Sequence, residues 1–194
     1  MNAFFASIAF NLRRLFDFRG RETQILFWPY VIFVYGLATA VTTSLTMRPI
    51  LAMAFEMMQQ IKVAADQGGN AAPAFIKAPE MLVPDLSGLV LPIMLVNLLA
   101  IGLLAAAVAR RLHDKDRSGY WGLLPLPSML LGLVLLPTAL PQFFVFGQPN
   151  PLVSLLMLNN VATFGLLVAL IVLLVGKGSE GPNRFGGAIG VPGQ

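Results

Sequence analysis

The chain carries its densest run of charge in the stretch Ala109-Arg110-Arg111-Leu112-His113-Asp114-Lys115-Asp116-Arg117-Ser118-Gly119. Long uncharged runs lie on both sides of this stretch. Charged side chains are costly inside a bilayer, whereas uncharged helices are solvated well by lipid. We therefore interpret the stretch as a tight turn at a membrane surface, between two helices that span the membrane.

The composition also indicates an integral membrane protein. Of the 194 residues, 57% are hydrophobic and only 11% are charged, whereas about a quarter are charged in soluble domains. The absence of cysteine excludes disulfides, thiolate metal ligands and a cysteine nucleophile. The net charge of +4 does not indicate a nucleic-acid partner, because the basic residues flank apolar runs, as topology determinants do. We expect the lipid bilayer to be the partner and no nucleic acid to bind.

Uncharged runs long enough to cross a membrane lie before and after the turn. At a rise of about 1.5 Å per residue, a hydrocarbon core of about 30 Å needs roughly 20 residues. The run from Ser118 to Gly176 is long enough for two crossings, with a proline-rich turn and an aromatic band of Phe143, Phe144 and Phe146 between them. We predict an all-α membrane protein with four transmembrane helices, at residues 25–47, 86–109, 120–140 and 154–176.

The N-terminal segment, residues 1–18, has apolar side chains at spacings of three and four with polar residues between them. This pattern predicts an amphipathic helix that lies in the interface plane, with Arg13 and Arg14 toward anionic headgroups. Packing of the helix on the rest of the protein is an equally good alternative. The arginines follow the apolar stretch instead of preceding it, which is not the pattern of a cleaved signal peptide.

The hydrophilic segments complete the predicted organisation. Residues 48–85 are predicted to be an extracytoplasmic loop, with a helix lying on the bilayer or on the bundle in its first half. The methionines of that half also allow a pliable binding groove. Pro73, Pro79 and Pro84 predict irregular structure in the second half. Residues 177–194 form a glycine-rich cytoplasmic tail that is expected to be extended.

Polar residues within the predicted spans allow a second class of function. Asn97 lies near mid-membrane, where we expect its amide to bond a neighbouring helix. Asn159 and Asn160 are expected near the outer end of their span, at the headgroups. Alternatively, Asn97 lines a path in a small-solute transporter or channel component that works as an oligomer. Small residues on the span 86–109 also permit contact between copies in a homo-oligomer.

The distribution of Lys and Arg predicts the orientation in the membrane. Ten of the 13 Lys and Arg residues lie in the N-terminal segment, the charged turn and the tail, which four crossings place on one side. The other three, Arg48, Lys62 and Lys77, lie in one long loop. Cytoplasmic loops carry the excess of basic residues, so both termini are predicted to be cytoplasmic.

Three polar motifs meet on that side: Phe18-Arg19-Gly20-Arg21-Glu22, the turn Arg110–Gly119, and Gly181-Pro182-Asn183-Arg184-Phe185-Gly186. Together, over about residues 18–186, they resemble the bacterial inner-membrane family known as domain of unknown function 805. The resemblance implies a multi-pass protein of the inner (plasma) membrane and no established activity. The departures are Tyr120 before Trp121, Thr23 and Gln24 where a further basic residue is frequent, and a long loop after the first span.

The charged residues of these motifs are the candidate site. A network of arginines and carboxylates would lock helix ends together. The alternative is an anion site for a phospholipid headgroup or a phosphorylated ligand. The candidate residues of this polar cluster or anion site are Arg19, Arg21, Arg110, Arg111, His113, Asp114, Asp116, Arg117, Asn183 and Arg184.

Enzymatic chemistry is the least supported class of function. His113 beside Asp114 and Asp116 is a weak signal for a metal or a general base. Gly176-Lys177-Gly178-Ser179 lacks the upstream glycine of a phosphate-binding loop, and it follows a membrane span instead of a strand. We expect no enzyme activity, no catalytic residue, no metal and no cofactor.

Overall fold

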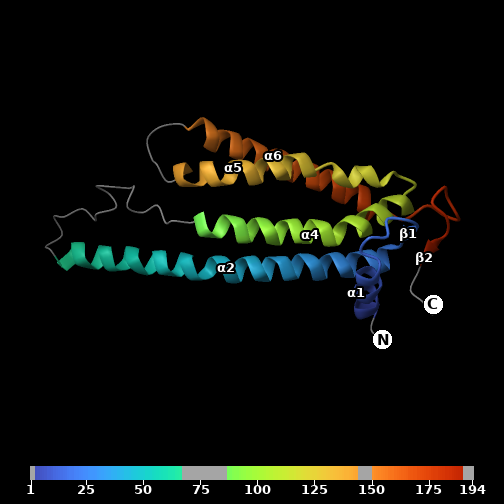
Figure 1. The fold of residues 1–194 in the computed structure, drawn as a ribbon, viewed down its shortest axis with the longest axis horizontal. Coiled ribbons are helices and arrows are strands. Elements are labelled where there is room, and N and C mark those ends of the chain that lie inside the picture. The colour runs from blue at the N-terminus through green and yellow to red at the C-terminus, as the bar shows by residue number, and fades with distance from the viewer. Residues whose placement is uncertain (1–2, 67–86, 144–149, 190–194) are drawn as a thin grey trace.

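The computed structural model describes residues 3–66, 87–143 and 150–189. In this part of the chain, four helices that are long and apolar enough to cross a membrane run side by side (Figure 1). They are α2 (Gln24–Asp66), α4 (Ser87–Asp114), α5 (Leu126–Phe143), which follows the short 3-10 helix η2 (Gly119–Leu123), and α6 (Pro151–Val175). The short helix α1 (Ala3–Arg13) precedes them. The predicted all-α fold with four spans and a short N-terminal helix is confirmed.

Helix α1 lies across the end of the bundle, close to both termini (Figure 1). It packs on α2 through its polar residues, because Ser7 and Asn11 are fully buried and Ser7 Oγ donates to the carbonyl of Leu26. Its apolar residues Phe5 and Leu12 are 62% and 45% exposed. The helix therefore presents Ser7, Ile8 and Asn11 to the protein and part of its apolar surface outward, and it ends at Arg13 instead of residue 18.

Helix α2 corrects the prediction for residues 48–85. We expected the span to end at Met47 and a separate surface helix to follow it, but one helix continues unbroken to Asp66. Apart from Pro49, this segment consists mostly of good helix formers such as Ala, Met, Gln and Glu. The first charge after the apolar run shows where the chain can leave lipid, not where the helix ends. The second half of the predicted loop lies outside the described residues.

Helix α4 corrects the expectation that a turn begins at Arg110. The helix continues to Asp114, and Asp116 then takes a left-handed φ of 56°. The amides of Asp116 and Arg117 donate to the carbonyls of His113 and Leu112 at 3.0 and 2.9 Å. This is the Schellman pattern, with aspartate where glycine is usual. Arg110 and Arg111 are consequently held on a regular helix.

Helices α5 and α6 form a hairpin with a polar contact inside it. The Ser118 side chain accepts the amide of Tyr120 as the cap of η2, and Asn150 caps α6. Asn159 is only 7% exposed, and its Nδ2 donates to the carbonyl of Ser128 at 3.1 Å. The expectation that Asn159 meets headgroups was therefore wrong. The aromatic band predicted at residues 143–146 falls on side chains outside the described ones.

The other predicted polar contact, at Asn97, was also wrong. Its Nδ2 donates at 2.8 Å to the carbonyl of Ile93, within α4 itself. The contact between neighbouring helices is made by Asn159 instead. Sequence position alone does not tell which of two asparagines faces another helix, since both lie within apolar runs.

Among the residues that the structure describes, two apolar cores hold the bundle. The larger one lies at the end that carries the termini and joins α2, α4 and α6 through Phe27, Tyr30, Ala107, Leu112 and Leu174. The smaller one lies within the α5–α6 hairpin. Two short strands, β1 (Arg21–Glu22) and β2 (Ala188–Ile189), pair in parallel and fasten the tail to the segment before α2.

Candidate functional site

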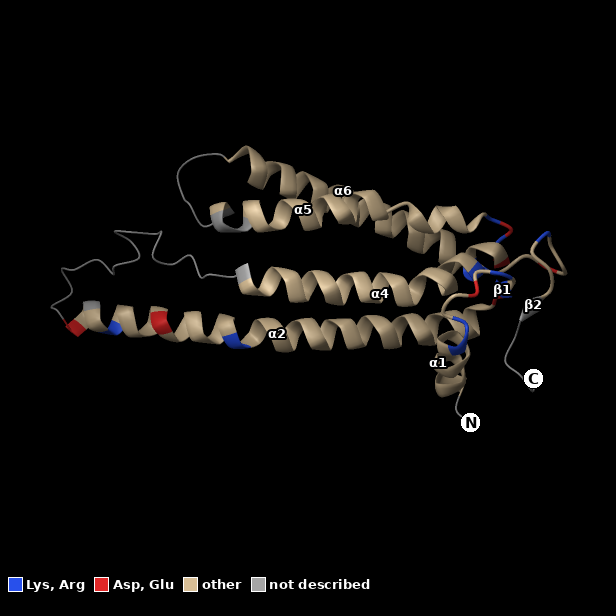
Figure 2. Ribbon diagram, viewed as in Figure 1, with Lys and Arg blue, Asp and Glu red and all other residues tan. Residues whose placement is uncertain are grey.

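The Lys and Arg residues gather at the end of the bundle where both termini lie (Figure 2). Within the described part of the chain, five charged side chains are buried there, each no more than 2% exposed: Arg21, Glu22, Arg110, Arg111 and Asp114. We call them the buried charge network. Isolated buried charges are strongly destabilising, so the partners of each group decide what the network does.

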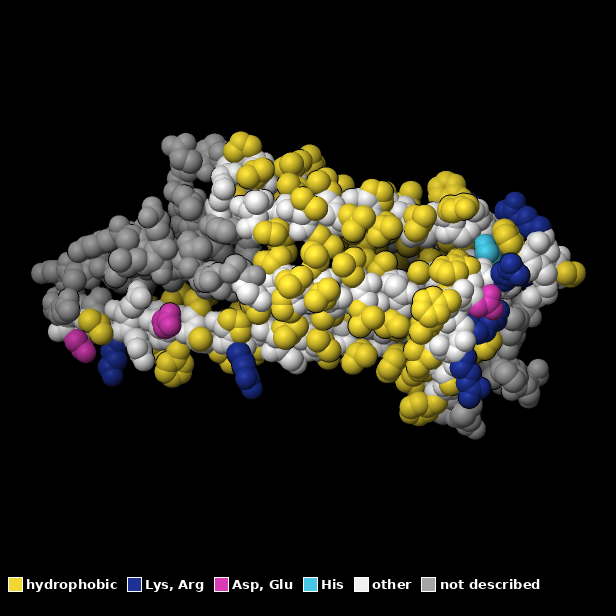
Figure 3. Space-filling view, in the orientation of Figure 1, with side chains coloured by type: hydrophobic (Ala, Val, Ile, Leu, Met, Phe, Trp, Pro, Cys, Tyr) yellow, Lys and Arg dark blue, Asp and Glu magenta, His cyan; other side chains and the backbone are white. Residues whose placement is uncertain are grey.

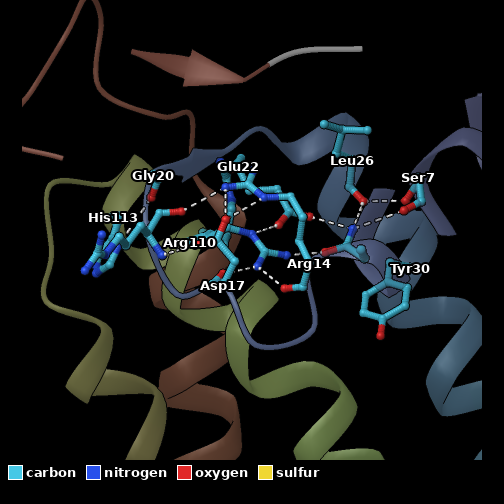
Figure 4. A network of polar contacts seen from close by, with 12 residues as sticks. Ser7, Arg14, Asp17, Gly20, Glu22, Leu26, Tyr30, Arg110 and His113 are labelled. Carbon is cyan, nitrogen blue, oxygen red and sulfur yellow. Dashed lines mark hydrogen bonds and ion pairs between the residues drawn. The ribbon is translucent and has the colours of Figure 1, made fainter. Parts of the chain in front are cut away.

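Arg110 is the centre of the first half of the network (Figure 4). Its Nε donates to Glu22 Oε2 at 2.8 Å and its Nη2 to Asn11 Oδ1 at 2.6 Å. Its Nη1 donates to the carbonyls of Arg14, at 2.9 Å, and Asp17. Asn11 in turn donates to Glu22 Oε1 at 2.8 Å. One guanidinium therefore ties α4 to α1 and to both ends of the segment that links α1 to α2.

Asp114 is the centre of the second half. Its Oδ1 accepts from Arg21 Nη2 at 3.0 Å, and its Oδ2 accepts from Arg111 Nη1. Arg21 also donates to the carbonyls of Ser179, at 2.7 Å, and Gly181. This half therefore connects β1 to the end of α4 and to the tail.

Arg111 joins the network to the end of α6. Its Nε donates to the carbonyl of Leu174 at 3.0 Å and its Nη2 to that of Gly176 at 2.6 Å. The last carbonyls of a helix have no partner within it and carry partial negative charge, which favours a cation there. Gln24 Nε2 adds a second donor to Gly176 O at 2.8 Å.

The tail folds back over His113. The His113 ring stacks on Phe185 at 3.9 Å between centroids and 7° between planes, and its Nδ1 lies 3.2 Å from Gly20 O. Asn183 Nδ2 donates to the His113 carbonyl at 2.9 Å. The tail up to residue 189 is therefore structured, where we expected an extended segment.

Burial and pairing shift the titration of two carboxylates near α1. Burial raises the pKa of the Glu22 carboxyl above its ordinary value, although Arg110 and Asn11 oppose that shift. At the surface, hydrogen bonding from Arg14 lowers the pKa of Asp17. The Arg14–Asp17 pair, 2.9 Å from Nε to Oδ2, closes the turn whose carbonyls receive Arg110.

The buried arginines find their hydrogen-bond acceptors within the protein. All three nitrogens of each buried guanidinium donate to protein oxygens. Among the described residues, the one buried side-chain oxygen or nitrogen without a partner is Gln60 Oε1, which lies on α2 and outside the network. The buried charges therefore join segments of the protein to one another.

The structure brings together most, but not all, of the predicted candidates. Arg21, Arg110, Arg111 and Asp114 are in the network, and His113 and Asn183 lie beside it. Asp116 pairs instead with Arg184 at 3.1 Å, with both side chains more than half exposed. Arg19 and Arg117 are exposed. Exposed pairs of this kind contribute little to stability.

The candidates predicted from the sequence lacked Glu22, a member of the network, and four residues that surround it: Ser7, Asn11, Gln24 and Gly178. A Cβ on Gly178 would overlap the Asp114 carboxylate, so only glycine fits there without a shift. A signal existed for Glu22, because it is the one carboxylate in the first polar motif. Asn11 and Ser7 look like the ordinary polar face of an amphipathic helix, so the sequence gives no sign that both side chains are buried.

No metal site is evident in the described residues, where no three His, Asp or Glu side chains are grouped to hold an ion. Comparison with protein families finds that the chain matches the family described as "Protein of unknown function (DUF805)" over residues 15–187. No curated protein and no solved structure matches the chain.

Proposed function

The chain belongs to the DUF805 family, and from this premise we propose that it is a non-enzymatic protein of the bacterial inner membrane that binds anionic phospholipid at its charged end. In this proposal the buried charge network is structural. The exposed basic residues around it form the lipid-binding surface. Neither role requires a cofactor.

The distribution of charge supports the proposed orientation. Basic residues dominate the end that carries both termini, whereas the far half of α2 carries both signs (Figure 2). Basic residues near span ends favour the cytoplasmic side. Both termini and the buried charge network would then lie at the cytoplasmic leaflet, which carries anionic lipids.

One observation carries the lipid proposal: α1 and the segment that follows it carry both exposed cations and exposed aromatic residues. Phe5 and Phe16 are 62% and 92% exposed, and Arg13 and Arg19 are exposed as well. Amphipathic segments with this composition bury their apolar side chains in the headgroup region and pair their cations with anionic headgroups. The buried arginines are already bonded to protein oxygens, so we assign headgroup binding to the exposed ones.

Native mass spectrometry with phosphatidylglycerol tests this assignment. Each basic residue near an anionic surface contributes about 1 kcal/mol, so an Arg13→Ala/Arg19→Ala variant should bind this lipid roughly 30-fold more weakly. The matched control, Arg48→Ala/Lys62→Ala, removes two basic residues from the far half of α2 and should bind as the wild type does. Equal binding of phosphatidylcholine, or an equal loss in the control, would contradict the proposal.

Thiol labelling of intact cells tests the orientation. The chain has no cysteine, so single substitutions give a clean background. A membrane-impermeant reagent should label Lys62→Cys and leave Lys177→Cys unlabelled until the cells are opened. The reverse pattern would place the charged end outside the cell and remove the basis of the lipid proposal.

A further inference from the structure

Helix α2 is longer than a membrane span requires. Its 43 residues extend for about 64 Å, roughly twice a hydrocarbon core of about 30 Å. It continues past the beginning of α4 (Figure 1). Its outer half still exposes apolar side chains, among them Met47, Ile50, Met58 and Ile61 at 46%, 50%, 69% and 47%. The bilayer can cover apolar side chains over the length of one span only. The apolar surface of the outer half must therefore be covered by something other than lipid.

A single row of residues runs along α2 with the spacing of a coiled-coil seam. The intervals alternate between four and three residues, which is the pattern of heptad positions a and d. We call this row the α2 seam; it consists of Gly36, Ala40, Thr43, Met47, Ile50, Ala54, Met57 and Ile61. With the seam at a and d, the charged residues of this half take the outer positions b, c and f: Arg48, Glu56, Lys62 and Asp66.

The α2 seam has no partner within the described part of the molecule. Gly36 lies on the opposite side of the helix from the core residue Val34, because two residues turn a helix by about 200°. A Cβ added to Gly36 would meet no atom within 4 Å. The other seam residues are exposed, apart from Met57, which is partly covered.

We propose that a second copy of the chain covers this face, in a parallel dimer joined along the α2 seam. Copies inserted in the same orientation have parallel α2 helices, so a two-fold axis pairs each seam residue with its own equivalent. Gly36, Ala40 and Thr43 are small enough for close approach within lipid. Farther out, Ile50 and Ile61 bury apolar surface from water. No charge lies on the seam, so pairing brings no like charges together.

Disulfide formation in native membranes tests the proposed dimer. Ala54 and Ala52 are both exposed alanines on α2, but only Ala54 lies on the seam. Seam positions of paired helices are close enough for a disulfide. Oxidation should therefore yield several-fold more covalent dimer with Ala54→Cys than with Ala52→Cys. Equal yields, or more dimer with Ala52→Cys, would overturn the proposal.

A size change at Gly36 gives an independent test in the Ala54→Cys background. Gly36→Leu places a bulky side chain on the seam and should lower the disulfide yield several-fold. Gly102→Leu is the matched control on α4, where an added Cβ also meets nothing within 4 Å. An unchanged yield with Gly36→Leu would overturn the dimer. Neither result bears on lipid binding, because these substitutions on α2 and α4 leave Arg13 and Arg19 unchanged.

Discussion

Arg110 shows how one residue can hold several segments at once. It is fully buried, and its guanidinium donates hydrogen bonds to a carboxylate, to a side-chain amide oxygen and to two backbone carbonyls. A buried ion pair need not stabilise a fold relative to an apolar pair of the same shape. Removing one partner is different, because the other charge stays buried without compensation.

Arg110→Ala should therefore destabilise the folded protein by roughly 3–5 kcal/mol. The measurement is the free energy or midpoint of unfolding in detergent. Arg13→Ala, which removes an exposed arginine, should change it by less than about 0.5 kcal/mol. Adding Glu22→Ala to Arg110→Ala should recover part of the loss, since the stranded charge is then gone. Simple addition of the two losses would show that the pair is not coupled.

Gly178→Ala tests the close packing around Asp114. The added Cβ would overlap the Asp114 carboxylate, which Arg21 and Arg111 hold in place, so the tail must shift. We expect a loss of about 1–3 kcal/mol. Gly187→Ala is the matched control in the same tail, since its Cβ would meet nothing within 4 Å. Equal unfolding midpoints for the two variants would argue against a rigid Asp114.

Glu22 makes a pH-dependent contribution whose sign follows from its pKa. Burial raises that pKa in the folded state above the ordinary value of 4.5, so folding is favoured most when the carboxyl is protonated. This contribution is lost as pH rises from 4.5 through the folded-state pKa. Glu22→Gln does not titrate, so the stability of the variant relative to wild type should rise across that interval. A fall in the stability of Glu22→Gln relative to wild type would mean that Arg110 lowers the pKa of Glu22 by more than burial raises it.

At the scale of the elements, hydropathy predicted the number and order of the spans but not the ends of the helices. Lipid solvation is a property of local composition, so the uncharged runs identified the four spans. Helix ends depend on capping and on tertiary partners. Thus α2 passes through Arg48 without a break, and α4 continues through Arg110 because its arginines find buried partners in α1, β1 and α6.

The α5–α6 hairpin gives a prediction from two adjacent asparagines. Asn159 bonds Ser128 on the neighbouring helix, whereas Asn160 bonds the carbonyl of Leu156 on its own helix at 3.0 Å. Interhelical polar contacts in membranes contribute about 0.6 kcal/mol on average and up to about 1.7. Asn159→Leu should lower stability by an amount in that range. Asn160→Leu should have a smaller effect, and the opposite ranking would place the polar contact elsewhere.

At the scale of the whole molecule, the buried charge network and the larger core together join the α2–α4 pair to the α5–α6 hairpin. The larger core lies at the charged end, and the smaller one lies inside the α5–α6 hairpin. The surface is hollowed between α4 and that hairpin (Figure 3). The sequence indicated that the three polar motifs share one end, but the pairing partners depend on side-chain directions that only the folded chain defines.

This arrangement predicts unequal rigidity along the bundle. Spin labels at Leu91 on α4 and Thr138 on α5 report the distance between the two pairs at the end away from the network, and labels at Thr138 and Leu152 report the distance within the hairpin. Double electron–electron resonance should give a broader distribution for the first pair than for the second, because the network, the larger core and η2, which fix α4 against the hairpin, lie at the charged end. Asp114→Asn should broaden the first distribution further and leave the second unchanged. Equally narrow distributions in wild type would mean that lipid or a second copy holds the far ends as firmly as the buried charges hold the near ones.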